Sequence, residues 1–371
     1  MIRLFHPLRL VDRTATSMQI AALAYNFSMD IEPAHPLVSF LLAGQLRRDF
    51  IVLPNGEMRL DVPGGNLLYA AAGLGIWETP AACGLVARVG EDYQQEWIEK
   101  IEQRSFDIRG IRRLPHSVDL RSFLAYPDLT TRPIENPINF FAGVDSAFPR
   151  VLYGYPDRSG APDSRTRLAP TSIRQVDFLE EYLDATAAHI CPLDYLTHSL
   201  IPAVLRQAGF TLVTLDPSPG YMNPSFRDDL PSLVTGLTAF FPSEEEVRAV
   251  FQGYTDDLWE MAEQLAGFGC EYVVIKRGQN GQLLFDSSAR ARWEIPAYPI
   301  QVFDPTGAGD AFCGGFLAGY RRTYDPLLAA LHGNISASLV LEGHGPFYAL
   351  EALPGLAQAR LEALHQSVRR V

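Results

Sequence analysis

The chain has 371 residues, of which 47% are hydrophobic, and a formal net charge of −12 at pH 7. This length and composition suffice for a large buried core, whereas the acidic balance argues against nucleic acid as the main partner because it repels phosphate backbones. The apolar runs are too short to cross a bilayer, and the N-terminus lacks the pattern of a signal peptide. We therefore expect a soluble, cytoplasmic protein without a membrane partner.

Cysteine and lysine usage argues against two further kinds of site. The four cysteines form no C-x-x-C pair, so we expect buried free thiols in a reducing compartment rather than a cysteine metal site. Lysine occurs only at Lys100 and Lys276, and neither lies in the Gly-Lys-Ser/Thr sequence of a P-loop. If this protein binds ATP, it must therefore do so with a different loop.

Residues 1–36 show no regular alternation of strands and turns and are interpreted as an N-terminal extension of a domain formed by residues 37–371. Apolar patterning predicts core strands, a hairpin with one solvated face and two helices in the first part of that domain: strands at 37–43 and 82–89, hairpin arms at 50–53 and 57–62, and helices at 66–77 and 93–105. Eight prolines between 115 and 170 predict a segment rich in loops, part of which we expect in a lid.

From residue 172 onward, strands and helices are predicted to alternate. The expected strands lie at 187–191, 210–215, 238–241, 271–275 and 282–285, and the expected helices at 172–184, 197–208, 244–267, 309–322, 325–341 and 356–369. Such alternation is typical of a mainly parallel sheet with helices on both faces, so the predicted fold class is α/β.

The most informative segment runs from Asp304 to Asp310 and reads Asp-Pro-Thr-Gly-Ala-Gly-Asp. It places a glycine-rich turn at the start of a helix whose first residues are small, where unpaired N–H groups and the helix dipole favour an anion. An ionised Asp310 at this position could accept a proton from an attacking hydroxyl group. The simpler alternative is a purely structural turn in which Asp310 caps the helix.

The same segment is similar to the D-T-x-G-A-G-D signature of the PfkB family of ribokinase-like carbohydrate kinases, with Pro305 in place of the usual threonine. The resemblance implies that Asp310 is the catalytic base. It also implies an anion hole of backbone amides and a threonine beside the nucleotide, which here would be Gly307, Ala308 and Gly309 for the anion hole and Thr306 for the nucleotide.

Weaker landmarks extend this resemblance over roughly residues 37–355. It implies a three-layer α/β/α ribokinase-like core with a mainly parallel sheet and a small β lid, built from about 46–62 and part of 118–142. Such a lid would exclude water from the site, so that ATP is not hydrolysed.

On the substrate side, residues 63–75 resemble the family's G-G-x-x-x-N-x-A segment, which implies that Gly64 and Gly65 lie against the substrate. Tyr69 falls where the family has asparagine, which suggests a different pocket with an aromatic wall. Asp49 falls where the family has an aspartate that binds sugar hydroxyls. Without the resemblance, these residues would be interpreted as a tight turn before a buried helix and an exposed turn residue.

On the nucleotide side, residues 276–281 resemble the family's T/K-x-G-x-x-G segment, which implies nucleotide contacts from Lys276, Gly278 and Gly281. As a bare pattern the segment is only a turn between two strands. By the same resemblance, Asn334 would lie beside the adenine, and the turn at 343–346 would help to close that side of the site.

The metal prediction depends on residues 242–246, which fall where the family has N-x-x-E. Glu246 matches the glutamate that organises Mg²⁺ through water, and Ser243 replaces the asparagine. A capping box of Ser243 with Glu246 at a helix start is an equally good interpretation, and both can hold. Asp216-Pro217-Ser218 resembles the family's D-P-N, again with serine for asparagine.

The sequence thus favours Mg²⁺-dependent transfer of a phosphoryl group from ATP to a hydroxyl group of a sugar or nucleoside. The resemblance also leaves room for a monovalent cation and a homodimer. One alternative is a non-catalytic relative that binds nucleotide or a partner protein, given the departures at Tyr69, Ser218 and Ser243. A second is a dinucleotide-dependent oxidoreductase, which would require a G-x-G-x-x-G after the first strand.

Overall fold

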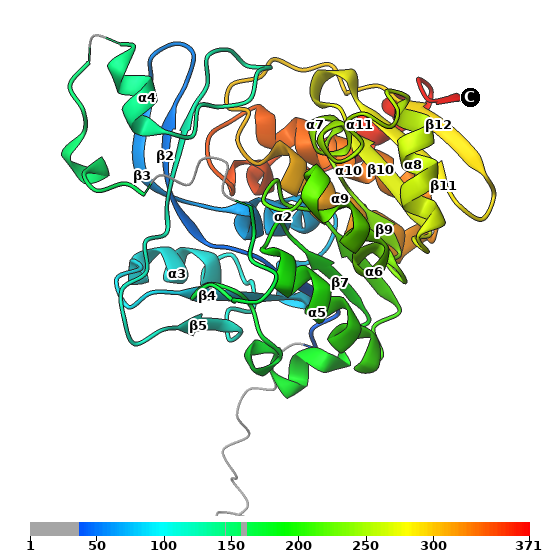
Figure 1. The fold of residues 1–371 in the computed structure, drawn as a ribbon, viewed down its shortest axis with the longest axis horizontal. Coiled ribbons are helices and arrows are strands. Elements are labelled where there is room, and N and C mark those ends of the chain that lie inside the picture. Colours follow the sequence, from blue (N-terminus) through cyan, green and yellow to red (C-terminus); the bar gives the residue numbers. More distant parts are fainter. Residues whose placement is uncertain (1–36, 145, 157–161) are drawn as a thin grey trace, which may run out of the picture. The chain divides into compact units, whose positions relative to one another are not determined.

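The computed structural model describes residues 37–144, 146–156 and 162–371, so the extension predicted at 1–36 lies outside the described residues. These residues form a ten-stranded sheet and a separate three-stranded sheet (Figure 1). The larger sheet has the order β13 (Arg369–Arg370), β12 (Ala291–Ile295), β11 (Gln282–Asp286), β10 (Tyr272–Lys276), β9 (Ala239–Phe240), β8 (Leu212–Leu215), β7 (Ala187–Ile190), β1 (Phe40–Ala43), β4 (Cys83–Val89) and β5 (Ile111–Arg113). Strands β10 to β5 pair in parallel, and only the β11–β13 edge is antiparallel.

Helices cover both faces of the larger sheet, as β1 illustrates. Phe40 and Leu42 pack into one hydrophobic core, and Leu41 and Ala43 pack into the other, because successive side chains of a strand point to opposite faces. The first core is covered by α2 (Asn66–Gly75), α3 (Gln95–Glu102), α9 (Ala308–Thr323), α10 (Pro326–Leu341) and α11 (Leu356–His365), and the second by α5 (Tyr195–Gln207), α6 (Leu230–Val234), α7 (Glu244–Val250) and α8 (Leu258–Gly267). The predicted three-layer α/β/α arrangement is confirmed.

Helices α2 and α9 touch through their backbones. A Cβ atom at Gly73 would lie 2.0 Å from the carbonyl oxygen of Ala311, and one at Gly314 would lie 1.9 Å from that of Ala70. Real Cβ atoms do not approach so closely, so glycine is required at both contacts. The contact fixes where α9 begins, and the glycine-rich turn lies at that point.

The smaller sheet, called the lid sheet below, has the order β3 (Met58–Gly64), β2 (Arg47–Val52) and β6 (Arg121–Ala125). The antiparallel pairing of β2 with β3 confirms the predicted hairpin. Strand β6 pairs with β2 in parallel and comes from the segment expected to be poor in strands. Behind it, Phe123 packs with Phe141 of α4 (Pro137–Ala142), which stands with β2 and β3 apart from the larger sheet in Figure 1.

Two predicted helices are wrong. The helix expected at 172–184 is replaced by two 3₁₀ turns, Gln175–Asp177 and Glu180–Asp184, because the buried Asp177 side chain bonds to Arg88 at 2.9 Å and to the backbone N–H of Arg174. The helix expected at 244–267 is two helices, α7 and α8, separated by a segment that contains Gly253 at φ 80°. The remaining 3₁₀ turns are Pro80–Ala82, Arg150–Leu152, Pro224–Asp229, Gly278–Asn280 and Tyr348–Glu351.

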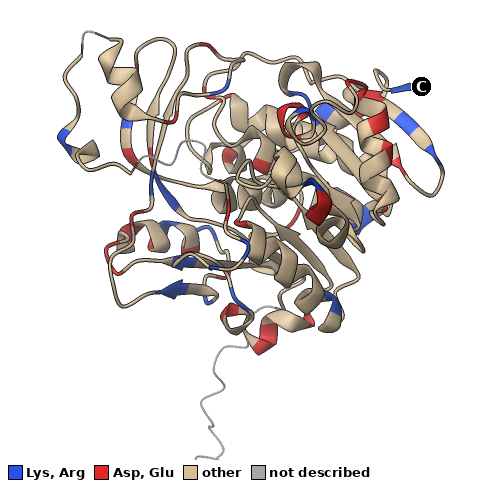
Figure 2. Ribbon diagram, in the orientation of Figure 1, with Lys and Arg blue, Asp and Glu red and all other residues tan. Residues whose placement is uncertain are grey.

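The cysteines, the length of the helices and the distribution of charges can be compared with what the composition predicted. All four cysteines are buried free thiols. Across the described ranges, every helix is too short or too polar to cross a lipid bilayer. Basic and acidic residues are interspersed over the helices and strands of the fold (Figure 2).

Candidate active site

The glycine-rich turn leads into α9 through Gly307, which occupies the cap position with a left-handed φ of 77°. A Cβ atom there would lie 2.0 Å from Cγ of Tyr69, so only glycine fits between the turn and that ring. Asp310 lies inside the first helical turn rather than at the cap, and no side chain caps the helix. The first N–H groups of α9 thus receive no hydrogen bond from a capping side chain, and the anion site expected there stays a prediction.

A cavity of about 520 Å³ lies between the lid sheet and the carboxyl ends of the parallel strands. This is where open α/β sheets bind ligands, and the volume suits a small organic molecule. The predicted site residues that line it are Asp49, Gly65, Tyr69, Thr306, Gly307 and Asp310. The other predicted site residues, Gly64, Glu246, Lys276, Gly278, Gly281, Ala308, Gly309 and Asn334, are not among its lining residues.

Asp310 lines this cavity from the first turn of α9. Burial raises its pKa to about 6, Lys276 opposes this shift, and the negative charge of Asp49 adds to it. A base with a pKa near 6 is ionised at neutral pH and still accepts a proton readily.

Asp49 is held in β2 of the lid sheet and is only 3% exposed, so the alternative of an exposed turn residue is wrong. Its carboxylate accepts a hydrogen bond from the backbone N–H of Gly65 at 3.3 Å. A Cβ atom at Gly64 would lie 1.7 Å from Oδ2 of Asp49, so the Gly64-Gly65 pair lets the carboxylate pack against the backbone. Burial raises the pKa of Asp49 to about 7, which leaves it able to accept or donate a hydrogen bond to a ligand hydroxyl near neutral pH.

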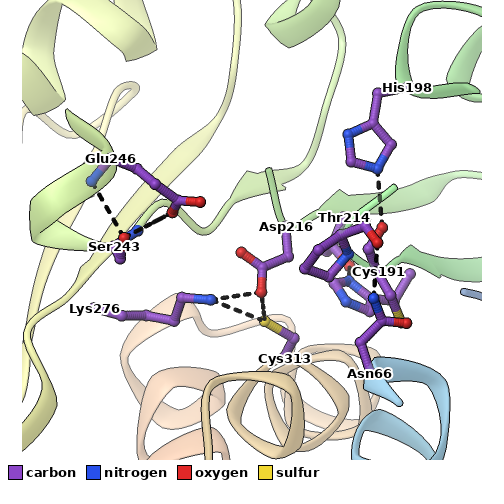
Figure 3. Close-up of polar contacts among 11 residues, drawn as sticks. Asn66, Cys191, His198, Thr214, Asp216, Ser243, Glu246, Lys276 and Cys313 are labelled. Atoms are coloured by element: carbon purple, nitrogen blue, oxygen red, sulfur yellow. Dashed lines mark hydrogen bonds and ion pairs between the residues drawn. The ribbon is translucent and has the colours of Figure 1, made fainter. Parts of the chain in front are cut away.

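Next to the glycine-rich turn lies a buried charge cluster (Figure 3). Nζ of Lys276 donates to Oδ2 of Asp216 at 2.5 Å, and Sγ of Cys313 lies 3.4 Å from the same oxygen. A Cβ atom at Gly309 would lie 3.4 Å from that Nζ, so the cation is next to the backbone of the turn. Burial by itself lowers the pKa of Lys276, but Asp216, Cys313 and Glu246 together raise it and keep the amine protonated, with Asp216 the largest of the three. Sequence reasoning placed Lys276 near the nucleotide and missed its partner.

Glu246 forms the predicted capping box of α7 with Ser243, as Figure 3 shows. Its Oε2 accepts from the backbone N–H and the hydroxyl of Ser243, each at 2.8 Å. Burial, and then the charge of Asp216, raise the pKa of Glu246 to about 7. Among the described residues, no group of three or more His, Cys, Asp or Glu side chains could hold a metal ion by itself. Mg²⁺ held through water and phosphate oxygens needs only one or two carboxylates from the protein, and Glu246 stays the predicted residue for that role.

Of the residues predicted on the nucleotide side, Gly281 and Asn334 have clear structural roles. A Cβ atom at Gly281 would lie 2.0 Å from the carbonyl oxygen of Ile295, which explains glycine there, whereas Gly278 faces open space at φ 52°. The side chain of Asn334 donates to Gln282 and Pro296 and accepts from the N–H of Tyr298. Because its polar atoms are engaged in this way, an adenine contact from Asn334 stays a prediction.

Asn66 is a site residue that the sequence analysis missed. Its Oδ1 accepts from the N–H of Gln45 at 2.8 Å, and its Nδ2 donates to the carbonyl oxygen of Pro192 at 2.7 Å. It thereby joins the first turn of α2 to two loops that line the cavity. His198 supports one of these loops, since its Nε2 lies 2.9 Å from the carbonyl oxygen of Cys191 (Figure 3). The polar residue directly after the Gly-Gly pair was the available signal.

Sequence comparisons relate the chain to known proteins. Residues 181–353 match the family model described as pfkB family carbohydrate kinase. The chain is 31% identical over 290 residues to a cytidine kinase of Thermococcus kodakarensis, and this alignment covers 77% of the chain and 90% of the relative.

Solved structures share the fold. An E. coli protein assigned as ribokinase II, in complex with ATP and Mg²⁺, matches with a TM-score of 0.64 and 21% identity over 89% of this chain and 100% of that one. A nucleoside kinase of Burkholderia thailandensis in complex with inosine matches with a TM-score of 0.60 and 20% identity over 88% of this chain and 99% of that one. The predicted core with its small lid is thus an arrangement found in other solved proteins.

Proposed function

Because the chain belongs to the PfkB family of carbohydrate kinases, we propose that it transfers a phosphoryl group from ATP to a hydroxyl group of a nucleoside. Membership makes it a kinase of the class that phosphorylates sugars and nucleosides. The narrower choice of a nucleoside is supported by the likeness to a cytidine kinase over most of both chains. The four free cysteines support a reducing compartment such as the cytoplasm as its location.

The charges that line the cavity also favour a neutral acceptor. Acidic side chains outnumber basic ones among the lining residues: Arg47 and Arg132 are basic, and Asp49, Glu135, Asp163, Asp194 and Asp310 are acidic. A sugar acid would bring a further carboxylate into this acidic surrounding, which costs binding energy. A nucleoside brings hydroxyl and amino groups, which carboxylates accept as hydrogen-bond donors.

In this proposal, Asp310 accepts the proton of the attacking hydroxyl group, and Asp49 helps to hold the acceptor in the cavity. The N–H groups of Gly307, Ala308 and Gly309 stabilise negative charge on the transferring group from a fixed position, which is the main way such sites accelerate phosphoryl transfer. Lys276 adds positive charge from behind the turn. Because the lid sheet forms one wall of the cavity, it limits the access of water to the reacting groups.

Mg²⁺ would supply a Lewis acid that neutralises phosphate charge, with Glu246 the residue proposed to orient its water shell. The buried carboxylate of Glu246, with one oxygen not used in the capping box, supports this assignment. A monovalent cation and a homodimer stay predictions.

The observation that carries the proposal is the position of Asp310 beside an open helix N-terminus at the edge of one cavity. Two alternatives are weaker. An oxidoreductase lacks support because Gly44-Gln45-Leu46, and no G-x-G-x-x-G, follows β1. A non-catalytic relative would not need a carboxylate at the anion site.

The test is ADP release with ATP and Mg²⁺ across a panel of nucleosides, sugars and sugar acids, with Asp310→Asn as the matched variant. We expect turnover with one or more nucleosides, and a loss of at least about 10²–10⁴-fold in Asp310→Asn with ATP binding by calorimetry retained. Undiminished turnover in Asp310→Asn would contradict the assignment of Asp310 as the catalytic base. Turnover with sugar acids alone would contradict the nucleoside proposal, and absence of turnover with the whole panel would contradict the kinase activity proposed for it.

A further inference from the structure

The lid sheet is joined to the glycine-rich turn by an ion pair between residues 245 positions apart in the sequence. Nη1 of Arg59, in β3, donates to Oδ2 of Asp304 at 3.1 Å. The Asp304 side chain is 2% exposed and that of Arg59 is 21% exposed, so water competes poorly for this contact. Arg59 does not line the cavity, and any effect it has on a ligand must pass through other residues.

The two oxygens of Asp304 do different things. Oδ1 accepts the backbone N–H of Thr306 at 3.0 Å and so shapes the turn that leads to the anion hole. Oδ2 accepts the hydrogen bond from Arg59 of the lid sheet. His344 also approaches Oδ2, but its Nδ1 is 3.7 Å away, beyond hydrogen-bond length, so Arg59 is the direct partner. A single carboxylate therefore connects the position of β3 with the conformation of the turn.

A second contact joins the opposite edge of the lid sheet to the same turn. The hydroxyl of Tyr126, directly after β6, lies 3.1 Å from the hydroxyl of Thr306. Strands β3 and β6 are the two outer strands of the lid sheet. Both edges of the lid are thus attached to residues 304–306, and the rest of the lid surrounds the acceptor side of the cavity.

We propose that Arg59 is a positioning residue for phosphoryl transfer: by fastening β3 to Asp304, it holds the glycine-rich turn in the conformation that forms the proposed anion hole. This inference rests on the proposed kinase function. Without Arg59, the buried carboxylate of Asp304 loses its direct charged partner, and a carboxylate in that state draws in water or shifts its position. The turn would then be less ordered, and ATP would be more open to attack by water.

The kinetic test compares Arg59→Ala with Arg48→Ala, a matched control. Arg48 forms an ion pair with Asp61 at 2.8 Å within the lid sheet, does not line the cavity and does not reach the turn. We expect Arg59→Ala to lower kcat between about 10- and 100-fold while the KM for the acceptor changes less than about threefold. ADP formed per phosphorylated acceptor should rise above one, and Arg59→Lys should restore part of kcat. Unchanged kcat and ADP ratio in Arg59→Ala, or an equal effect of Arg48→Ala, would overturn the proposal.

A second measurement does not depend on the identity of the acceptor. Amide hydrogen exchange, read by mass spectrometry on peptides covering 304–310, should be faster in Arg59→Ala than in the wild type and in Arg48→Ala, and close to wild type in Arg59→Lys. Equal exchange in all four proteins would overturn the coupling even if kcat falls. If the wild type turns over no acceptor, the proposed function fails, and the exchange result still decides whether Arg59 holds the turn.

Discussion

Asp310 lies near the buried ion pair of Lys276 with Asp216 and near two further acids. These charges determine the pH at which Asp310 ionises. Burial is the largest cause and raises the pKa of Asp310. Lys276 lowers this pKa, whereas Asp49 and Glu246 raise it further. Asp310 in turn raises the pKa of Asp216, so the two carboxylates repel each other through the cluster. Because the proposed base must be ionised to accept a proton, the acid limb of the pH–rate profile should report this balance.

At the residue scale we expect kcat/KM of the wild type to fall as the pH decreases through about 6, where Asp310 becomes protonated. Asp216→Asn removes a negative charge that repels the Asp310 carboxylate, and the charge of Glu246 still favours the protonated form of Lys276. Asp310 should therefore ionise more easily, and the acid limb should move to lower pH by about half a unit or more. The pH dependence of kcat/KM measures this. Cys313→Ala is the control: burial raises the pKa of this thiol, which is therefore uncharged near pH 6, and the limb should stay in place. A limb that moves to higher pH in Asp216→Asn would contradict the assignment of Asp310.

At the scale of elements, the position of the anion hole depends on the contact between α2 and α9. Gly73 of α2 lies against the carbonyl oxygen of Ala311, one residue after Asp310. This contact leaves no space for a methyl group. A change at Gly73 should therefore alter the first turn of α9 as well as the stability of the protein.

We expect Gly73→Ala to lower the free energy of unfolding by about 1–3 kcal/mol, because the added methyl group forces the two helices apart, and to reduce kcat with it. Gly267→Ala is the matched control. Gly267 ends α8, is exposed and has open space around its missing Cβ atom. Alanine there should raise stability by about 0.4–1 kcal/mol and leave kcat unchanged. Urea unfolding and steady-state kinetics of both variants check this, and equal stability changes would contradict the close-contact argument.

The elements that the sequence predicts well are those with local signals. The hairpin of β2 and β3, the small-residue helix α2 and the turn before α9 all follow from neighbouring residues. The helix expected at 172–184 failed because a distant residue, Arg88, holds Asp177 and competes with the local pattern. The pairing of β6 with β2 is likewise a long-range contact that periodicity does not report.

In the candidate site, too, features with local sequence signals could be predicted and long-range contacts could not. The position of Asp310 in the first turn of a helix after a glycine-rich turn could be predicted because seven consecutive residues form both, and their roles stay predictions. The partner of Lys276 could not be predicted, since Asp216 lies 60 positions away. Arg59 was equally hidden, because an arginine in a hairpin has no sequence feature that indicates a buried aspartate on another element. Contacts between elements are set by the fold, and a single sequence contains few signals for them.

For the whole molecule, the site concentrates buried acids where two sheets meet. Burial is the main cause that raises the pKa of Asp49 to about 7, of Asp310 to about 6 and of Glu246 to about 7. Each group binds its proton more tightly in the folded protein than in the unfolded chain. Ionising these groups therefore works against folding, and such a trade-off between stability and function is common at active sites.

These raised pKa values make the stability of the folded protein depend on pH. A carboxyl group whose folded pKa is raised contributes stability that is fully present below its unfolded pKa, near 4, and is lost as the pH rises through its folded pKa. For Asp49, the rise from 3.8 to about 7 corresponds to on the order of 4 kcal/mol lost by pH 8, at about 1.4 kcal/mol per pKa unit. The contribution of these acids should thus decline between pH 5 and 8, the range in which activity increases.

We expect the melting temperature, measured by calorimetry, to fall from pH 5 to pH 8, and Asp49→Asn to reduce that fall. At pH 8 the variant should be more stable than the wild type, because it removes a buried negative charge and keeps the shape of the side chain, while its activity declines because the acceptor loses a hydrogen-bond partner. Asp128→Asn is the control, since Asp128 is exposed and its pKa is lowered by hydrogen bonds from Thr130 and Thr131, so its contribution is lost only at acid pH. Parallel melting profiles for the wild type and Asp49→Asn would mean that Asp49 has a similar pKa in the folded and unfolded states, and that hydrogen bonds to its carboxylate already offset its burial.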